Sequence, residues 1–331
     1  MYGLFSSLLS AGLLTFAVGA QAAQRVSGPH EHYNLAVYLV HDDTATRAAA
    51  GDVVTLEAAL AAGHAVVHET GDVNQLAVEN TSRSQTVFLQ AGDIVKGGKQ
   101  DRVLSQDLVL GPRSGKIPIA AFCVEGGRWS ARNGDDVASF GSSKHSLSSK
   151  ELKLAARRAK SQQEVWNEVA ALQGRLSRAL EAPVASQRST TSLQLTLENA
   201  QLAETKQAYV NALAPLVESH ADAIGFVIAI NGTIQTAEVY AQPDLFRASW
   251  AKQLDAAATE AISIMRAAGD PAPPVHAVDA FLRTAERGKD VPGERPDATR
   301  SAVRETDASV FFESRTGATA ESWLHRSYIA K

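Results

Sequence analysis

The spacing of the apolar residues changes near residue 148, and this change constrains the fold more than any other feature of the sequence. Before that point, short apolar runs alternate with turn-forming residues, which is the pattern of β-strands. After it, apolar residues recur every three or four positions, as they do along one face of an amphipathic helix. The chain is therefore predicted to be an α+β protein whose β-rich half comes first.

The β-rich half is predicted to span residues 33–140. Leu35, Val37 and Leu39 alternate with their neighbours as in a strand, and a short helix is expected over 54–62, ending at Gly63. Further strand-like runs, separated by turn-forming residues, lie at 64–69, 73–79, 85–90, 102–110 and 117–124. We expect these strands to form a sandwich or a partial barrel.

The second half, residues 148–331, is predicted to be mainly helical. Ser148 and Glu151 have the spacing of a capping box. The apolar pattern that follows predicts one long helix, or two joined ones, over 149–181. Other helices are expected over 199–221 with a kink or restart at Pro215, from Pro243 to about residue 267, and over 276–286. The polar segments are predicted to be an edge strand or loop at 187–197 and a surface loop at 287–307.

Asn231-Gly232 is the clearest hairpin signal in the chain. Asn-Gly accepts the positive φ angles of a tight type I′ turn, and it lies between the apolar runs 224–230 and 233–240. A last strand pair is expected at Val310–Glu313 and Trp323–Ile329. We expect residues 33–331 to form one composite domain.

The first 22 residues have the pattern of a signal peptide. Leu8–Val18 is an apolar run of suitable length, and Ala20-Gln21-Ala22 supplies the small-x-small pattern of a cleavage site. The run is too short for a transmembrane helix, which needs roughly 20 apolar residues. No Lys or Arg precedes the run, and an apolar N-terminal helix of the fold is the alternative. We expect cleavage near Ala22, a secreted or periplasmic location, no membrane span, and a polar tether over 23–32.

Charge and cysteine content exclude several classes of function. The 32 Lys and Arg against 36 Asp and Glu give a formal net charge of −4, which provides no general attraction to nucleic acid. The single cysteine, Cys123, excludes an intrachain disulfide and a cysteine-only zinc site. Because Cys123 lies in an apolar run, we interpret it as a buried, inert thiol. The alternative is a catalytic nucleophile, which needs a base from elsewhere in the fold.

Motifs of several enzyme classes are missing from the sequence. It contains no P-loop, no GxGxxG, no HExxH, no GxSxG and no CxxC. The pairs His30/His32 and His64/His68 can each share one face of a strand, and His41-Asp42-Asp43 offers three oxygen or nitrogen ligands. A solvated tail, a half-exposed strand and a turn are the simpler interpretations. We therefore expect no metal site and no cofactor.

Two charged loops are the best candidates for a site. The segment 91–102 holds three cations, two carboxylates, one amide and three glycines. Ammonium and guanidinium groups beside glycine amides can bind phosphate or carboxylate. In the second loop, 125–129, Arg128 and Trp129 can hold an anion and stack on a planar ring. The alternative is that the charged side chains of both loops pair with one another and fix the register of the sheet.

These loops also carry a resemblance to a bacterial family, the ARG and rhodanese-phosphatase-superfamily-associated protein domain of the first type. The similar stretches are Val78–Thr81, Gly92-Asp93, Gly97–Arg102 and Cys123–Trp129, and the likeness continues through Ile224–Tyr240 and the helix with Phe246 and Trp250. Many members carry Glu where this chain has Asp93. The resemblance implies a fold and ligands that carry ADP-ribose or phosphate, but no particular reaction. The signature residues it implies are Asp93, Lys99, Gln100, Arg102, Glu125, Arg128 and Trp129.

Two functions of different class remain open. The first is a non-catalytic module outside the cytoplasm that binds an anionic small molecule or polymer. Its candidate ligand-binding residues are Asp93, Lys96, Lys99, Gln100, Arg102, Glu125, Arg128 and Trp129. The second is a hydrolase acting on a phosphorylated or ADP-ribosyl-like compound, with Asp93 or Glu125 as general base. That hypothesis loses its basis if both carboxylates are held in salt bridges. A structural role is a third option.

Overall fold

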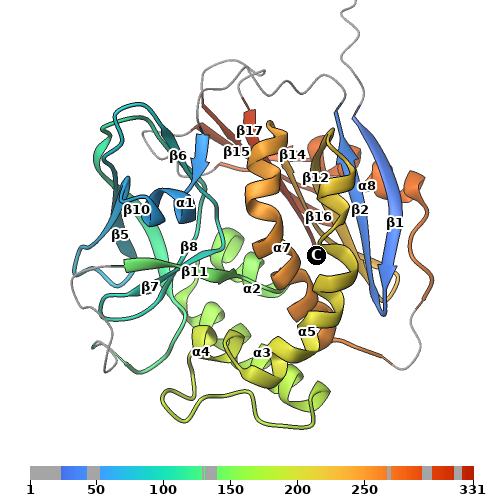
Figure 1. The fold of residues 1–331 in the computed structure, drawn as a ribbon, viewed down its shortest axis with the longest axis horizontal. Coiled ribbons are helices and arrows are strands. Elements are labelled where there is room, and N and C mark those ends of the chain that lie inside the picture. The colour runs from blue at the N-terminus through green and yellow to red at the C-terminus, as the bar shows by residue number, and fades with distance from the viewer. Residues whose placement is uncertain are drawn as a thin grey trace, which may run out of the picture.

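The computed structural model describes residues 24–42, 53–128, 130, 140–266, 270–292, 300–316 and 323–331. The predicted signal peptide and its cleavage site near Ala22 lie outside the described residues, as does Trp129. The described part has two β-units with helices between them and around them (Figure 1). The chain is thus an α+β protein, and most strands of its first half belong to one of the two units.

The larger unit is an eight-stranded antiparallel sheet with the order β1-β2-β12-β13-β17-β16-β15-β14. It combines the first two strands of the chain with strands from its last third (Figure 1). The bounds are β1 Arg25–His32, β2 Leu35–His41, β12 Ala223–Ile230, β13 Thr233–Tyr240, β14 Lys289–Asp290, β15 Arg300–Glu305, β16 Ser309–Arg315 and β17 Trp323–Ala330. The predicted Asn-Gly hairpin is confirmed as β12–β13, and the predicted last strand pair as β16–β17.

Residues 25–32 form strand β1, so the polar tether that we expected over 23–32 is wrong for these residues. β1 pairs with β2 along its length, with a shift in register between Ser27 and His30. It is the outermost strand of the sheet, and its residues are only half-buried or exposed. An edge strand has one neighbour and tolerates polar side chains, so its polar composition resembled a solvated tail.

The smaller unit confirms the β-rich first half. A six-stranded sheet has the order β11-β7-β8-β10-β5-β4, and its two outer strands contact each other, so the sheet is a partial barrel. A three-stranded sheet, β3-β6-β9, and the short helix α1 complete the unit. The bounds are β3 Val53–Thr55, α1 Leu56–Ala61, β4 Ala65–Glu69, β5 Gln75–Asn80, β6 Thr86–Leu89, β7 Asp93–Gly97, β8 Arg102–Leu104, β9 Leu108–Leu110, β10 Gly115–Cys123 and β11 Phe140–Ser146.

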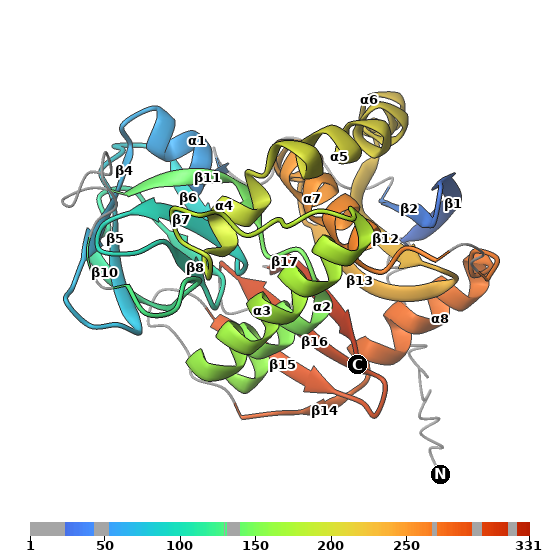
Figure 2. The same cartoon turned by 90° about the horizontal axis from the view of Figure 1, so that it is seen from below.

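The helices cover both faces of the large sheet. In β2, Leu35, Val37 and Leu39 face the core under α7, whereas Ala36 and Tyr38 face the core under α8. Figure 2 shows α5 and α7 on one side of the sheet and α8 on the other. The bounds are α2 Lys150–Leu154, η1 (a π-helix) Ala155–Ala159, α3 Gln162–Ala179, α4 Leu193–Leu197, α5 Ala200–Leu213, α6 Leu216–Ser219, α7 Pro243–Ser263 and α8 Val275–Glu286.

Most helix predictions are confirmed, and one break has a clear cause. The helix expected over 149–181 is divided at Lys160, which has a left-handed φ of 51° and ends η1 before α3 begins. Pro215 ends α5 and caps α6, as expected. Pro243 occupies the first turn of α7, where its missing N–H costs nothing.

Two polar segments were predicted wrongly. Within 187–197, the leucines from Leu193 to Leu197 form helix α4 and not an edge strand, because the Ser192 hydroxyl caps the helix by accepting from the Leu195 N–H. The expected surface loop at 287–307 contains β14 and β15, which extend the edge of the large sheet. Like β1, these strands are polar because they lie at the edge.

Candidate functional site

The second predicted loop is held by an ion pair between Glu125 and Arg128. The Nε and Nη2 atoms of Arg128 donate to Oε1 and Oε2 of Glu125 at 2.7 and 2.8 Å. The Ser189 hydroxyl also donates to Oε1 at 2.5 Å. Glu125 is fully buried, and both of its oxygens accept hydrogen bonds. Such a bidentate, charge-assisted pair fixes the loop strongly.

Three further signature residues meet around this ion pair. Arg128 Nη1 donates to the Lys99 carbonyl at 2.8 Å, and Gln100 Nε2 donates to the Glu125 carbonyl at 3.3 Å. Arg102 is fully buried next to them, and its Nη1 donates to the Gln100 carbonyl at 3.0 Å. The hydrogen bonds of Lys99 and Gln100 with Arg128 and Glu125 therefore hold the two loops against each other.

Asp93 and Lys96 point to other partners. Asp93 Oδ1 lies 3.3 Å from the Lys252 ammonium, and its Oδ2 accepts from the Gln90 N–H at 3.3 Å. Lys96 pairs with Glu198 on α4–α5. Burial alone would lower the pKa of Lys252, but the neighbouring carboxylates Asp93 and Glu57 outweigh it and raise this pKa.

These contacts bear directly on the two hypotheses. Asp93 and Glu125, the two carboxylates that the hydrolase needs, are both held in ion pairs. This is the condition under which the hydrolase hypothesis loses its basis. The cations Lys96 and Arg128 likewise lie against carboxylates of the same chain. The geometry favours the alternative that these loops fix the sheet.

Cys123 and the histidine pair His64/His68 take structural positions. Cys123 is buried, and burial raises the pKa of its thiol, which lowers its reactivity. His64 Nδ1 lies 2.8 Å from the side-chain oxygen of Gln85, and His68 Nε2 lies 3.1 Å from Glu79. The two imidazoles thus have separate partners.

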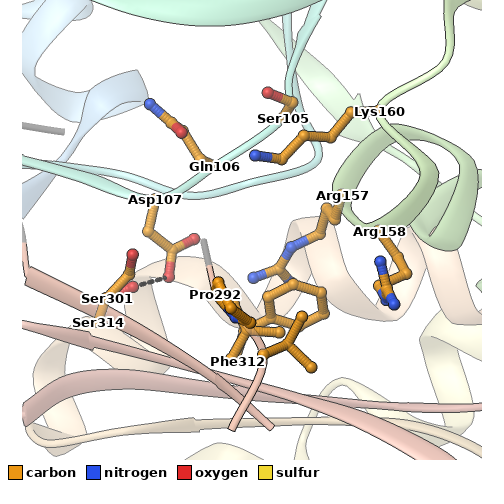
Figure 3. A pocket seen from close by; sticks show the side chains of 12 residues that line it. Ser105, Gln106, Asp107, Arg157, Arg158, Lys160, Pro292, Ser301, Phe312 and Ser314 are labelled. Atoms are coloured by element: carbon orange, nitrogen blue, oxygen red, sulfur yellow. Dashed lines mark hydrogen bonds between the residues drawn. The ribbon is translucent and has the colours of Figure 1, made fainter. Parts of the chain in front are cut away.

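A hollow that the sequence did not indicate lies where the partial barrel meets the edge of the large sheet (Figure 3). Its empty volume is about 630 Å³, part of it open to solvent. We call it the Arg157 hollow. It is lined by Ser105, Gln106 and Asp107 from the β8–β9 loop, Arg157, Arg158 and Lys160 from η1 and its end, and Val291, Pro292, Ser301, Val303, Phe312 and Ser314 from the sheet edge.

Arg157 is the central cation of this hollow. Arg157 is only 5% exposed. Its guanidinium carbon lies 4.1 Å from the centroid of the Phe312 ring, in cation–π contact. Nη1 donates to the Ser327 hydroxyl at 2.7 Å. Nε is buried and has no hydrogen-bond partner among the described residues. An unsatisfied buried donor is costly, so the protein does not fully compensate the burial of the Arg157 guanidinium.

Two further cations flank Arg157. Arg158 donates from Nε and Nη2 to Glu305 at 3.1 and 2.7 Å, and Glu305 also pairs with Lys331 at 2.7 Å. The Lys160 side chain extends across the top of the hollow toward Ser105 and Gln106 (Figure 3). Arg158 is partly exposed. The wall formed by η1 is therefore cationic.

The floor of the hollow rests on a buried charge network. Asp107 Oδ2 accepts from the Ser314 hydroxyl at 2.6 Å and lies 2.8 Å from His325 Nδ1. His325 Nε2 lies 3.1 Å from Glu238, whose other oxygen accepts from the Lys153 ammonium at 3.0 Å. Asp107, His325 and Glu238 are all buried. Loop β8–β9, strands β13 and β17 and helix α2 all contribute to this network.

The network shifts the pKa values of Asp107, Glu238 and His325 toward their charged forms. Burial alone would lower the pKa of His325, but Asp107 and Glu238 outweigh it and raise this pKa to about 9. Burial opposes ionisation of the carboxylates too, yet Lys153 and His325 lower the pKa of Glu238 to about 2, and His325 lowers that of Asp107. His325 is therefore a buried imidazolium at neutral pH.

The charges around Arg157 leave an excess of positive charge. Lys153, Arg157 and His325 are three cations, and Asp107 and Glu238 are two carboxylates, so these five carry a net charge of +1. Glu260 is also buried near Lys153, and burial raises its pKa to about 7, so a large share of it is neutral at neutral pH. The buried charges beside the hollow therefore do not cancel, and a net positive charge remains.

Comparison with known proteins gives a family. A family model described as the ARG and Rhodanese-Phosphatase-superfamily-associated Protein domain matches residues 23–329. The chain belongs to this family. No curated protein and no solved structure gives a significant match. In the part of the chain that the structure describes, no helix is both long and apolar enough to cross a membrane.

The family domain contains both the signature loops and the Arg157 hollow, because the match covers every residue that lines either of them. Sequence reasoning missed the hollow because its parts come from distant segments. The available signal was the basic run of Arg157, Arg158 and Lys160. Basic residues are common in the last turn of any helix, where they complement its dipole, so the run alone did not stand out.

Proposed function

We propose that this protein is a non-catalytic binding module that holds an anionic small molecule in the Arg157 hollow. The observation that carries the proposal is the buried guanidinium of Arg157, whose Nε has no hydrogen-bond partner among the described residues and which lines a hollow open to solvent. Guanidinium groups suit planar recognition of phosphate and carboxylate. Arg158 and Lys160 add positive charge to the same wall.

The proposal keeps the anionic ligand expected from the sequence and changes its place. The loops 92–102 and 125–129 carry cations that lie against Glu125 and Glu198 of the same chain. An external anion would have to compete with these carboxylates. The lining of the Arg157 hollow holds three cations, Arg157, Arg158 and Lys160, and one carboxylate, Asp107, so an anion there meets a net attraction.

The location forms part of the same proposal. The apolar run Leu8–Val18 and the Ala20-Gln21-Ala22 pattern support export through a cleaved signal peptide, to the periplasm or the outside of the cell. N-terminal sequencing of the protein recovered from the periplasm or the medium tests this step. A mature protein that begins near residue 23 supports it, and an uncleaved protein in the cytoplasm contradicts it.

Binding is tested by thermal shift and calorimetry with inorganic phosphate at constant ionic strength. We expect saturable stabilisation by phosphate, because a ligand that binds only the folded state adds to the free energy of unfolding. Lys160→Gln and Arg158→Gln are expected to weaken phosphate binding on the order of threefold to tenfold, as each removes one charge. The matched control is Lys116→Gln on β10, an exposed lysine of the partial barrel that lies outside the hollow.

Three outcomes contradict the proposal. The first is that neither phosphate, sulfate nor a small carboxylate stabilises the protein saturably. The second is that Lys160→Gln and Arg158→Gln bind phosphate as tightly as Lys116→Gln does. The third is release of inorganic phosphate from a bound ester, which would show that the module is an enzyme.

A further inference from the structure

The walls of the Arg157 hollow differ in character. One part of the lining carries the cations Arg157, Arg158 and Lys160, and another part is apolar, formed by Val291, Pro292, Val303 and Phe312. Figure 3 shows Pro292 and Phe312 next to the Arg157 guanidinium. An inorganic anion would contact the cationic wall and leave the apolar wall in water. The apolar wall therefore calls for a ligand that also has an apolar part.

The charge at the cationic wall favours a doubly charged group. Arg157 adjoins a network that carries a net charge of +1, and Arg158 shares Glu305 with Lys331. Lys160 adds a further positive charge at the top of the hollow. A carboxylate offers one negative charge, whereas a phosphate monoester offers nearly two at neutral pH, together with three acceptor oxygens. The phosphate monoester matches this wall better.

The lining of the hollow points to the organic part. Four of its twelve residues, Val291, Pro292, Val303 and Phe312, are apolar, and a bare oxyanion would leave them in contact with water. The apolar side chains Val291 and Val303 and the ring of Pro292 offer contact area without hydrogen-bonding groups. The Arg157 guanidinium already covers one face of Phe312, so the ligand's apolar part would pack mainly on Val291, Pro292 and Val303. A group the size of one ring suits that contact.

We infer that the ligand of the Arg157 hollow is a phosphate monoester whose organic group is apolar and about the size of one ring. This inference rests on the proposed function and adds the substrate class to it. The phosphate lies against the part of the Arg157 side chain that lines the hollow. The organic group lies against Val291, Pro292 and Val303.

The test compares phenyl phosphate, methyl phosphate and inorganic phosphate by calorimetry at pH 7.5 and constant ionic strength. Phenyl phosphate is expected to bind on the order of tenfold more tightly than inorganic phosphate, because it also removes apolar surface from water. Methyl phosphate is expected to lie close to inorganic phosphate. The affinity order separates the role of the ring from the role of the charge.

Two variants assign the preference to the apolar wall. Val303→Thr replaces a methyl group with a hydroxyl at nearly constant shape, and is expected to weaken phenyl phosphate roughly threefold to fivefold while leaving inorganic phosphate unchanged. The matched control, Val66→Thr, changes an exposed valine of β4 that is not part of the hollow lining and is expected to leave both affinities unchanged. Thermal unfolding of each variant without ligand confirms that it is folded.

The inference is overturned if phenyl phosphate binds no more tightly than inorganic phosphate, or if Val303→Thr weakens both ligands equally. In either case the proposed function stands, because inorganic phosphate still binds. If no phosphate compound binds at all, the proposed function fails and the ligand class fails with it.

Discussion

His325 Nδ1 lies 2.8 Å from Asp107 Oδ2, although 218 positions separate the two residues in the chain. Asp107 comes from the partial barrel and His325 from the large sheet, so this buried ion pair connects the two β-units. Ser314 donates to the same oxygen of Asp107 and also lines the Arg157 hollow. Asp107 and Ser314 therefore both line the hollow and take part in the connection between the two units.

The first prediction concerns this ion pair. Asp107→Asn is expected to lower the free energy of unfolding by roughly 3–5 kcal/mol, because it leaves the buried charge of His325 with one partner fewer. Urea unfolding at pH 7 measures the change. The control His68→Gln breaks a half-exposed pair with Glu79 and is expected to cost only about 0–1 kcal/mol. Equal losses in the two variants would show that the buried pair adds no special stability.

The second prediction concerns alkaline pH. His325 has a folded-state pKa of about 9, raised from the usual 6.5 against burial by Asp107 and Glu238, so the folded protein binds its proton more tightly than the unfolded chain does. This contribution to stability is complete below pH 6.5 and disappears as the pH rises to 9. The free energy of unfolding is expected to fall by up to about 3 kcal/mol across this window.

Urea unfolding at pH 6, 7.5 and 9 measures that slope. His325→Gln removes the titrating group and should flatten the slope between pH 6.5 and 9, whereas His68→Gln should keep it. A variant without His325 that loses stability as steeply as the original protein would rule out this histidine as the source.

The third prediction separates a structural role of the signature loops from a binding role. Glu125→Gln weakens the bidentate pair with the Arg128 guanidinium, and Glu125 is fully buried. We expect a loss of about 2–4 kcal/mol in the free energy of unfolding and no change in phosphate affinity. Glu198→Gln, which breaks the exposed pair with Lys96, is the control and should cost about 0–1 kcal/mol. A stable Glu125→Gln protein with weakened phosphate binding would return the ligand to these loops.

The fourth prediction concerns close packing of the central strands. A Cβ at Gly225 on β12 would lie 2.4 Å from the Glu238 carbonyl oxygen and 2.7 Å from the Val239 Cα on β13. Gly225→Ala is therefore expected to lower the free energy of unfolding by roughly 1–3 kcal/mol, because strand backbone must move. Gly141→Ala on β11 is the control, since no atom of the described residues lies within 4 Å of its Cβ position. Circular dichroism during thermal unfolding compares the two, and equal midpoints would show that β12 and β13 can separate freely.

The part of the fold that could be predicted from the sequence is the part with local signals. Asn231-Gly232 specifies its own turn, and Pro243 specifies the start of a helix, so both were predicted correctly. Strand β1 was missed, as were β14 and β15, because edge strands carry polar residues and obtain their order from a neighbour distant in the sequence. Helix α4 was missed because alternating leucines in a short segment fit two periods equally well.

The candidate site was harder to predict than the fold. The sequence showed that the 92–102 and 125–129 loops carry charge, and the structure shows that Glu125 and Arg128 neutralise each other. No local sequence pattern marks Asp107 or His325, because each of them is important only as the ion-pair partner of the other. A buried ion pair formed across 218 positions leaves no periodic pattern in either segment. Pairing of this kind depends on the tertiary fold.

The order of strands in the large sheet also has a consequence for the synthesis of the protein. Strand β2 lies between β1 and β12, and His41 at its end contacts Asp222, which comes 181 positions later in the chain. While the ribosome is still translating the residues in between, β2 has no inner neighbour, and its run of apolar side chains has no core to enter. Exposed apolar surface and an unpaired strand edge of this kind make an incomplete chain prone to aggregate. Strand β2 can gain its inner neighbour only when β12 has been made, at residue 230 of 331, and the sheet is complete only with β17, at residue 330.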